Sequence, residues 1–293
     1  MMSLRIVVVV LAVLTGVTGS PIVTVMPEAD SVDVTAHPNS VPEVEEENEI
    51  TGQEVLVDEE IEEVMETGEL NPNHYPARRA AQVVQHYLNT RHGSPYRLFG
   101  MHEVHRGNAE DVDSGRKYQL EISVRERISN TTEKCSAEVL FPKGEPQRSP
   151  EVQASCGDLL TNNSKAQEEA LYQKYKGSQT PVSAEYLPDS HGHIEPDMEP
   201  FWHLCTVASS FVMLNESTEN TVYNMAQVAN ITQLASENNQ LKFDCHTLLH
   251  EMVSQEIIHW KLLFTWSPPE GVKVLQMEQL PHCHECKKPP HTN

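Results

Sequence analysis

The chain has no Lys or Arg between residues 21 and 77, although this stretch carries sixteen Asp and Glu residues. Aromatic residues are also scarce there. Such a stretch cannot bury enough apolar surface to offset the loss of chain entropy on folding. We therefore expect residues 20–70 to form an acidic, disordered extension. The extension holds most of the formal net charge of −22, and the absence of a basic excess excludes nucleic acid as a natural partner.

Long apolar runs are absent as well, apart from a short one at the start of the chain. Arg5 precedes the apolar stretch 6–14, and the small residues Gly16, Gly19 and Ser20 follow it. This order is typical of a secretory signal peptide, and we place it at residues 1–19. No later run is long enough to cross a bilayer. The sequence therefore predicts a secreted protein that is not anchored in a membrane.

Enzyme motifs are missing too. There is no Gly-x-Ser-x-Gly elbow, no phosphate-binding glycine loop and no Cys and His pair suited to nucleophilic catalysis. His250-Glu-Met-Val-Ser254 approaches the zinc-protease helix motif, but Ser254 stands where that motif needs its second His. The sequence therefore predicts a protein that is not an enzyme and that carries no metal or other cofactor.

What the chain does have is an internal repeat. Segments 117–124 and 135–142 are echoed by segments 242–249 and 259–268. A repeat of roughly a hundred residues is too long for a solenoid unit and indicates a duplicated small domain. Hydrophobic spacing predicts, in each half, one helix followed by an antiparallel meander, which makes the fold class α+β. The predicted helices span 76–91, 163–175 and 196–214, and the predicted strands span 96–106, 117–128, 134–142, 150–156, 222–234, 241–252, 256–266 and 272–277.

Four separate segments resemble the latexin family: 73–81, 135–142, 187–194 and 248–258. The resemblance covers about residues 71–280. It implies two tandem cystatin-like modules, each a helix wrapped by a four-stranded antiparallel sheet. The modules are expected at 71–160 and 196–280, with a helical connector at 161–195 between them and a C-terminal tail at 281–293.

The same resemblance implies a function. Latexin-like proteins inhibit zinc metallocarboxypeptidases of the A type, and the family's contact residues correspond to His250 and Gln255. The alternative is that these two are ordinary residues at a hairpin end. The chain also departs from related patterns, because His259 stands where latexin has Pro. The cystatin signature Gln-x-Val-x-Gly is absent from the turns predicted at 129–133 and 253–256, which argues against inhibition of papain-like proteases.

The signal peptide and the acidic extension are similar to those of an avian eggshell matrix member of the family. This resemblance implies a protein of an extracellular, eggshell-type matrix. A second hypothesis follows, in which the chain is a non-inhibitory structural protein. Its acidic extension would then bind Ca²⁺ or calcium carbonate mineral, because carboxylate oxygens suit hard cations. Other matrix proteins are further candidate partners.

The six cysteines suggest an oxidising compartment. Cys135 and Cys156 fall on neighbouring predicted strands, which predicts a disulfide. Cys205 and Cys245 are expected to form either a second disulfide or two buried thiols. The tail pair, Cys283 and Cys286, has neighbouring histidines. Because a second zinc-ligand pair at defined spacing is missing, a local or intermolecular disulfide is favoured there over a metal site.

Four Asn-x-Ser/Thr sequons fit an extracellular protein. They lie at Asn130, Asn162, Asn215 and Asn230. Asn130 is the strongest candidate for glycosylation, because it falls in a predicted hairpin turn.

Overall fold

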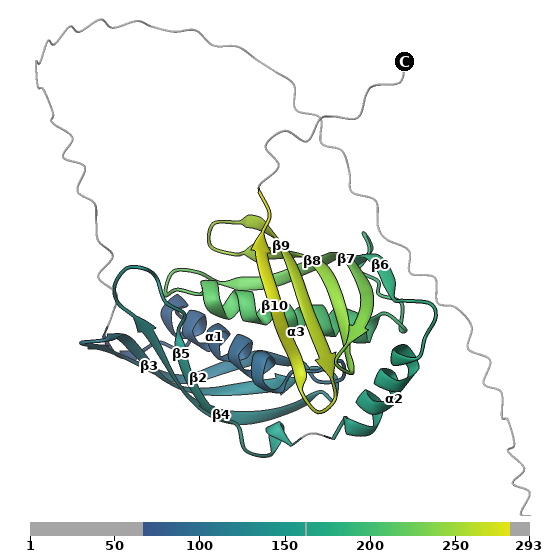
Figure 1. Ribbon diagram of the computed structural model, residues 1–293. Coiled ribbons are helices and arrows are strands. Elements are labelled where there is room, and N and C mark those ends of the chain that lie inside the picture. The colour runs from purple at the N-terminus through teal and green to yellow at the C-terminus, as the bar shows by residue number, and fades with distance from the viewer. Residues whose placement is uncertain (1–66, 162, 282–293) are drawn as a thin grey trace, which may run out of the picture. The chain divides into compact units, whose positions relative to one another are not determined.

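The computed structural model describes residues 67–161 and 163–281, all within one compact unit. These residues form two five-stranded antiparallel sheets and three α-helices (Figure 1). The predicted signal peptide and nearly all of the predicted acidic extension lie outside the described residues.

The first lobe is one helix packed against one sheet. Its sheet has the order β1-β2-β3-β4-β5, and α1 contacts β2, β3, β4 and β5. Pro76 lies in the first turn of α1, where the missing N–H costs no helical hydrogen bond. The core joins buried residues of the helix, such as Val84 and Leu88, to Tyr118, Ile122 and other residues of the sheet. The elements are β1 (Gly68–Leu70), α1 (Tyr75–His92), β2 (Phe99–Val112), β3 (Gly115–Glu126), β4 (Thr131–Pro142), β5 (Glu151–Ser155) and the 3₁₀ helix η1 (Gly157–Leu160).

The second lobe repeats this arrangement. Its sheet has the order β10-β9-β8-β7-β6, and α3 contacts β7, β8, β9 and β10. Side chains of β8 alternate strictly, so that odd-numbered residues are buried and even-numbered residues are half-buried on the other face. The elements are β6 (Ser183–Leu187), α3 (Glu199–Glu216), β7 (Tyr223–Glu237), β8 (Gln240–Glu251), β9 (Glu256–Ser267) and β10 (Gly271–Gln279).

The prediction of four strands in each sheet is wrong by one. Each sheet has a fifth strand at its edge, β1 in one lobe and β6 in the other. β1 falls in the segment predicted as disordered extension, yet Leu70 is buried in the core of the first lobe. β6 falls in the predicted connector. Both strands are short and pair on one side only, so their sequences carry too few residues for an alternating pattern.

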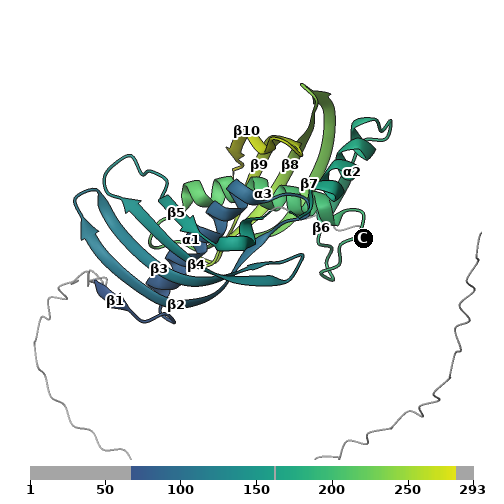
Figure 2. The same ribbon diagram turned by 90° about the horizontal axis from the view of Figure 1, so that it is seen from below.

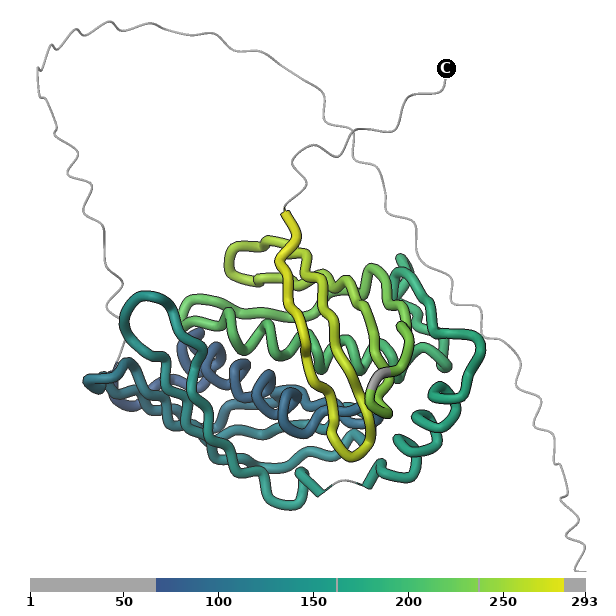
Figure 3. The backbone as a smooth tube through the Cα atoms, in the orientation of Figure 1, coloured from purple at the N-terminus to yellow at the C-terminus, as the bar shows by residue number. Residues whose placement is uncertain are grey.

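Helix α2 (Lys165–Lys176) lies between the two lobes in sequence. Leu171 and Tyr172 of this helix belong to the core of the second lobe, and the Tyr172 ring meets Trp266 edge-on. The tube view follows the chain from β5 through this helix into β6 (Figure 3). The helix therefore contributes directly to the second core.

The lobes meet where α1 and α3 pack side by side (Figures 1 and 2). Gly93, at the end of α1, allows this approach, because a Cβ there would lie 2.6 Å from Cγ2 of Val207 on α3. It would also lie 2.4 Å from the carbonyl oxygen of Asn89. Within the part of the chain that the structure describes, no helix has the length and apolar character needed to cross a membrane.

Candidate functional site

The two residues implied by the family resemblance lie at the end of the β8–β9 hairpin. His250 is half-buried near the end of β8, opposite Ile257 of β9 and Asn224 of β7. Gln255 is exposed in the turn and has a φ of 61°, in the left-handed region that non-glycine residues seldom adopt. Its side-chain amide donates a hydrogen bond to the carbonyl of Met252. We call residues 250–257 the hairpin end.

A buried carboxylate holds this turn in place. Glu251 accepts hydrogen bonds from the backbone N–H groups of Val222 at 2.9 Å, Val253 at 3.1 Å and Ser254 at 2.6 Å. Burial alone would raise the pKa of Glu251, but the hydrogen bonds from Val222, Ser254 and Val253 outweigh it and leave the pKa below its usual value. The ionised form of Glu251 therefore fixes the shape of the hairpin end.

The first lobe contains a matching arrangement. We call each of the two a carboxylate clasp: a buried Glu that accepts hydrogen bonds from backbone N–H groups of the turn that follows it. Glu126, at the end of β3, accepts backbone hydrogen bonds from Leu98 at 3.1 Å, Ile128 at 3.0 Å and Ser129 at 2.7 Å. Burial again opposes ionisation, and the hydrogen bonds from Ser129, Ile128 and Leu98 again lower the pKa of Glu126 overall. Asn130 has a φ of 57° at the position that Gln255 occupies in the second lobe. The two turns are therefore built alike.

The two hairpins differ in their exposed apolar side chains. Met252, Val253 and Ile257 of the hairpin end are 42%, 49% and 39% exposed. The turn of the first lobe exposes Ile128 at 43%, but its other positions are polar or charged: Arg127, Ser129, Asn130 and Thr131. The hairpin end, whose backbone is held by Glu251, thus exposes three large apolar side chains, whereas the matching turn of the first lobe exposes one.

The hairpin end also adjoins the first lobe. Gln82 of α1 donates to Oδ1 of Asn224 at 3.0 Å, and the amide of Asn224 donates to the sulfur of Met252. One face of α1 makes these contacts, since Arg79, one turn earlier, also reaches the second lobe. Tyr75 begins the same face and is 74% exposed. The surface beside the hairpin end therefore includes residues from both lobes.

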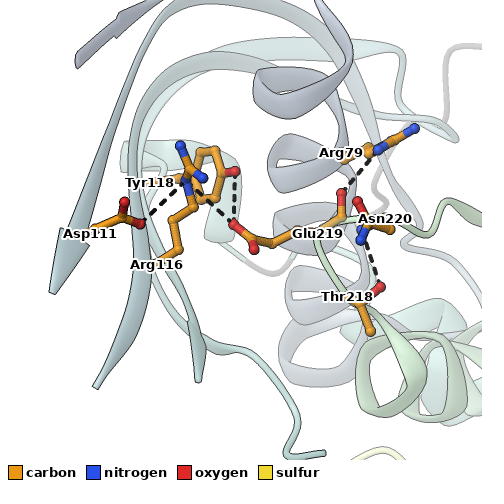
Figure 4. Close-up of polar contacts among 7 residues, drawn as sticks. All are labelled: Arg79, Asp111, Arg116, Tyr118, Thr218, Glu219 and Asn220. Atoms are coloured by element: carbon orange, nitrogen blue, oxygen red, sulfur yellow. Dashed lines mark hydrogen bonds and ion pairs between the residues drawn. The ribbon is translucent and has the colours of Figure 1, made fainter. Parts of the chain in front are cut away.

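A polar cluster that includes Arg79 also joins the lobes (Figure 4). Arg79 donates to the carbonyl of Glu219 at 3.2 Å, and the Tyr118 hydroxyl donates to the Glu219 carboxylate at 3.0 Å. Arg116 lies between Asp111 at 3.8 Å and Glu219 at 3.6 Å. Burial raises the pKa of Glu219, while Tyr118 and Arg116 oppose the rise. Burial, together with the negative charge of Glu219, also raises the pKa of Tyr118.

The lobe interface repeats one contact at equivalent positions. Arg79 of α1 donates to the backbone carbonyl of Glu219, in the loop after α3. His203 of α3 lies 2.7 Å, through Nδ1, from the backbone carbonyl of Pro95, in the loop after α1. Arg79 and His203 are 124 positions apart in the sequence, as are Pro95 and Glu219. In each lobe, therefore, a side chain of the helix contacts a backbone carbonyl in the loop that follows the helix of the other lobe.

Disulfides tie each lobe internally. Cys135 of β4 is bonded to Cys156, which follows β5. Cys205 of α3 is bonded to Cys245 of β8. Among the described residues, no group of three or more His, Cys, Asp or Glu side chains is placed to hold a metal ion. The tail residues Cys283 and Cys286 lie outside the described residues.

The sequons lie in three different settings. Asn130 is exposed in the β3–β4 turn. Asn215 is exposed in the last turn of α3, where its side-chain oxygen accepts a hydrogen bond from Ser149. Asn230 is half-buried within β7, between Glu185 of β6 and His246 of β8. Asn162 lies outside the described residues.

Sequence reasoning missed the two carboxylate clasps. A signal was present, because Glu126-Arg-Ile-Ser-Asn130 and Glu251-Met-Val-Ser-Gln255 share Glu, a β-branched residue and Ser at the same spacing. The β-branched residue and the Ser mark the two turn N–H groups that the carboxylate binds. The similarity of these two turns is part of the same internal repeat.

Comparison with known proteins gives a consistent family match. A family profile described as Latexin matches residues 70–284. Human Latexin is 34% identical over 215 residues, which cover 73% of this chain and 97% of that protein. Human Retinoic acid receptor responder protein 1 is 31% identical, covering 72% of this chain and 73% of that protein. Ovocalyxin-32 of Gallus gallus is 33% identical, and the match covers 70% of this chain and 75% of that protein.

Proposed function

The chain belongs to the latexin family, and we propose that it is a secreted inhibitor of zinc metallocarboxypeptidases of the A type. As a member of this family it is not an enzyme. In this proposal, two cystatin-like modules at residues 71–160 and 196–280, linked by residues 161–195, present the hairpin end to the target. The protein acts outside the cell, in an eggshell-type matrix.

One observation carries this proposal: the hairpin end exposes apolar side chains on a backbone that is already fixed. Met252, Val253 and Ile257 offer apolar contact area, and Glu251 binds three backbone N–H groups, two of the turn and that of Val222 just before β7. Exposed apolar residues at a rigid site are typical of binding surfaces, because little conformational entropy is lost on association. The adjoining start of α1 enlarges the surface with Tyr75.

Gln255 has two roles in this proposal. Its side-chain amide holds the turn by donating to the Met252 carbonyl, and its exposed position in the turn makes it accessible to a partner. A polar side chain among exposed apolar neighbours suits the edge of an interface that must tolerate water before binding. His250, one residue before Glu251, is paired across the strands with Ile257 of the same surface.

Two substitutions of Gln255 distinguish the contribution of its side-chain amide from that of its backbone conformation. Both Gln255→Ala and Gln255→Gly remove the amide, but only glycine accepts the left-handed φ of 61° without strain. If the amide makes the contact, both variants inhibit a pancreatic-type carboxypeptidase A more weakly than the wild-type chain. Asn130→Gly, at the matching position of the first lobe, serves as the control. Full inhibition by both Gln255 variants, or no inhibition by the wild-type chain at micromolar concentration, would contradict the proposal.

A second candidate function rests on the acidic extension. Sixteen Asp and Glu residues without a Lys or Arg between positions 21 and 77 make a polyanion that can bind Ca²⁺ or adhere to calcium carbonate. Deleting residues 21–66 should then reduce adsorption to calcium carbonate, and added salt should weaken the adsorption of the full chain. Equal adsorption of full-length and truncated chains would rule this function out.

A further inference from the structure

The turn between β3 and β4 of the first lobe adjoins a cavity. Ser129 and Thr131, the two neighbours of Asn130 in the chain, both line this cavity, which has a volume of about 320 Å³. That volume is at the lower end of the range for small-molecule sites, roughly 300–1,000 Å³. The opposite wall comes from η1 and the start of α2, and includes Gln167. The turn therefore stands at the edge of a space that can hold a small ligand.

The lining of this cavity suits a saccharide. Ile128, which is 43% exposed, and half-buried Tyr96 provide an apolar platform, and both also line a second cavity at the start of α3. Ser129, Thr131 and Gln167 add side-chain hydroxyl and amide groups. A sugar ring packs its C–H groups on apolar side chains, and its hydroxyl groups donate and accept hydrogen bonds. Both kinds of partner are present in this one cavity.

Asn130 offers a point at which a sugar can be attached. It is exposed, and it begins the sequon Asn130-Thr-Thr132. Among the described residues, no hydrogen bond engages the Asn130 side chain, whereas the Asn215 side chain already accepts one from Ser149. Asn230 is half-buried within β7. A glycan on Asn130 therefore breaks no hydrogen bond of the folded protein.

The carboxylate clasp of the first lobe fixes this attachment point. Glu126 binds the backbone N–H groups of Ile128 at 3.0 Å and Ser129 at 2.7 Å. Asn130 has a φ of 57°, in the left-handed region that Asn adopts more readily than most residues. Consecutive Cα atoms are about 3.8 Å apart, so a sugar linked to Asn130 starts beside two lining residues. Because the turn is already held, little conformational entropy of the protein is lost when the sugar packs.

We propose that Asn130 carries an N-linked glycan whose first two sugars, both N-acetylglucosamine, pack on Ile128 and occupy the cavity beside the turn. The sugar then removes the exposed apolar area of Ile128 from water. In the second lobe, Gln255 stands at the position of Asn130, and it begins no sequon. The internal repeat thus yields one turn that is covered by its own glycan and one, the hairpin end, that is bare.

The test is removal of this glycan from the native chain. The full chain is secreted from animal cells that make only high-mannose glycans. Endoglycosidase H, which cuts between the two N-acetylglucosamines, is then added without denaturant. Mass spectrometry of the tryptic peptide 128–134 reports the occupancy of Asn130 and the rate of cleavage. All samples carry Asn162→Gln, because Thr161 and Asn163 also line the cavity and a glycan between them would compete for it.

We expect Asn130 to be glycosylated. Cleavage in the native chain should be at least about tenfold slower than in the isolated glycopeptide 128–134, a ratio that corresponds to about 1.4 kcal/mol of contact. Ile128→Ser combined with Gln167→Ala should restore most of the lost rate. Val253→Ser is the matched control, because Val253 has the position of Ile128 in the second turn and should leave the rate unchanged.

Three outcomes would overturn the proposal. The first is an Asn130 without glycan, and the second is an equal rate in the native chain and the glycopeptide. The third is slow cleavage that persists in the combined Ile128 and Gln167 variant, which would mean that the glycan does not use the cavity. Thermal unfolding verifies that each variant folds. Because no carboxypeptidase is present, the result is independent of the inhibitor proposal.

Discussion

The clasp formed by Glu251 can be weakened without changing the shape of the side chain. In Glu251→Gln the acceptor on Oε1 survives, but the charge is lost and an NH₂ group can face the Ser254 N–H, which now binds the carboxylate at 2.6 Å. One hydrogen bond is therefore removed, and those from Val222 and Val253 become neutral. A hydrogen bond to a charged group contributes roughly 1.5–3 kcal/mol and a neutral one about 0.5–1.5 kcal/mol, so losing one charged bond and weakening two others should together cost about 4–5 kcal/mol.

Glu126→Gln is the natural control, because Glu126 makes the same three contacts in the first lobe. Both residues are equally buried, at 5% exposure. We expect the two variants to lose similar stability in urea unfolding, measured as a lower midpoint at constant slope. Inhibition of carboxypeptidase A should weaken only for Glu251→Gln, which loosens the hairpin end.

Two outcomes would refute this reasoning. Wild-type stability for both variants would mean that the carboxylates do not hold the turns. Equal loss of inhibition in Glu126→Gln and Glu251→Gln would mean that inhibition does not depend on which turn is disturbed.

Three other predictions concern stability and pH. Replacing Cys205 and Cys245 together by Ala opens a link across 40 residues and should cost about 4 kcal/mol, measured by urea unfolding; a loss below about 1 kcal/mol would contradict the expected constraint. His86 is buried, and burial lowers its pKa to about 4, an effect that a hydrogen bond with the backbone of Tyr223 only partly offsets. Since the unfolded chain takes up this proton near pH 6.5, stability should fall by about 3 kcal/mol between pH 6.5 and pH 4. His86→Phe should remove this part of the pH dependence in acid titrations followed by circular dichroism, and an unchanged profile would show that other groups cause it. The lowered pKa of Glu251 adds stability at neutral pH that is lost as the pH falls through the pKa of the folded state. Glu251→Gln should therefore also reduce the loss of folding stability at acidic pH.

Local pattern was enough to predict the main elements of the fold. The apolar spacing of α1 and α3 and the alternation along β8 are visible in the sequence, and the structure places helices and strands there. The turn of the first lobe lies at residues 127–130, slightly earlier than predicted, because Glu126 closes β3 by binding the next N–H groups. A carboxylate clasp is a tertiary contact as well as a local one, and hydrophobic spacing does not report it.

The contacts between the lobes could not be predicted. Arg79 with the carbonyl of Glu219, and His203 with that of Pro95, join residues more than a hundred positions apart. The acceptors are backbone oxygens, which leave no trace in side-chain composition. The edge strands β1 and β6 were missed for a related reason, since their pairing is decided by the neighbouring strand and not by their own few residues. The roles of His250 and Gln255 remain predictions.

The central claim is that the hairpin end is the surface that meets the carboxypeptidase. Backbone hydrogen exchange of the full chain, measured with and without carboxypeptidase A, tests it most directly. We expect slower exchange in residues 250–257 and in the start of α1 on adding the enzyme, with no change at the matching turn, residues 126–131. Slower exchange at residues 126–131 instead, or no protection anywhere at saturating enzyme, would contradict it.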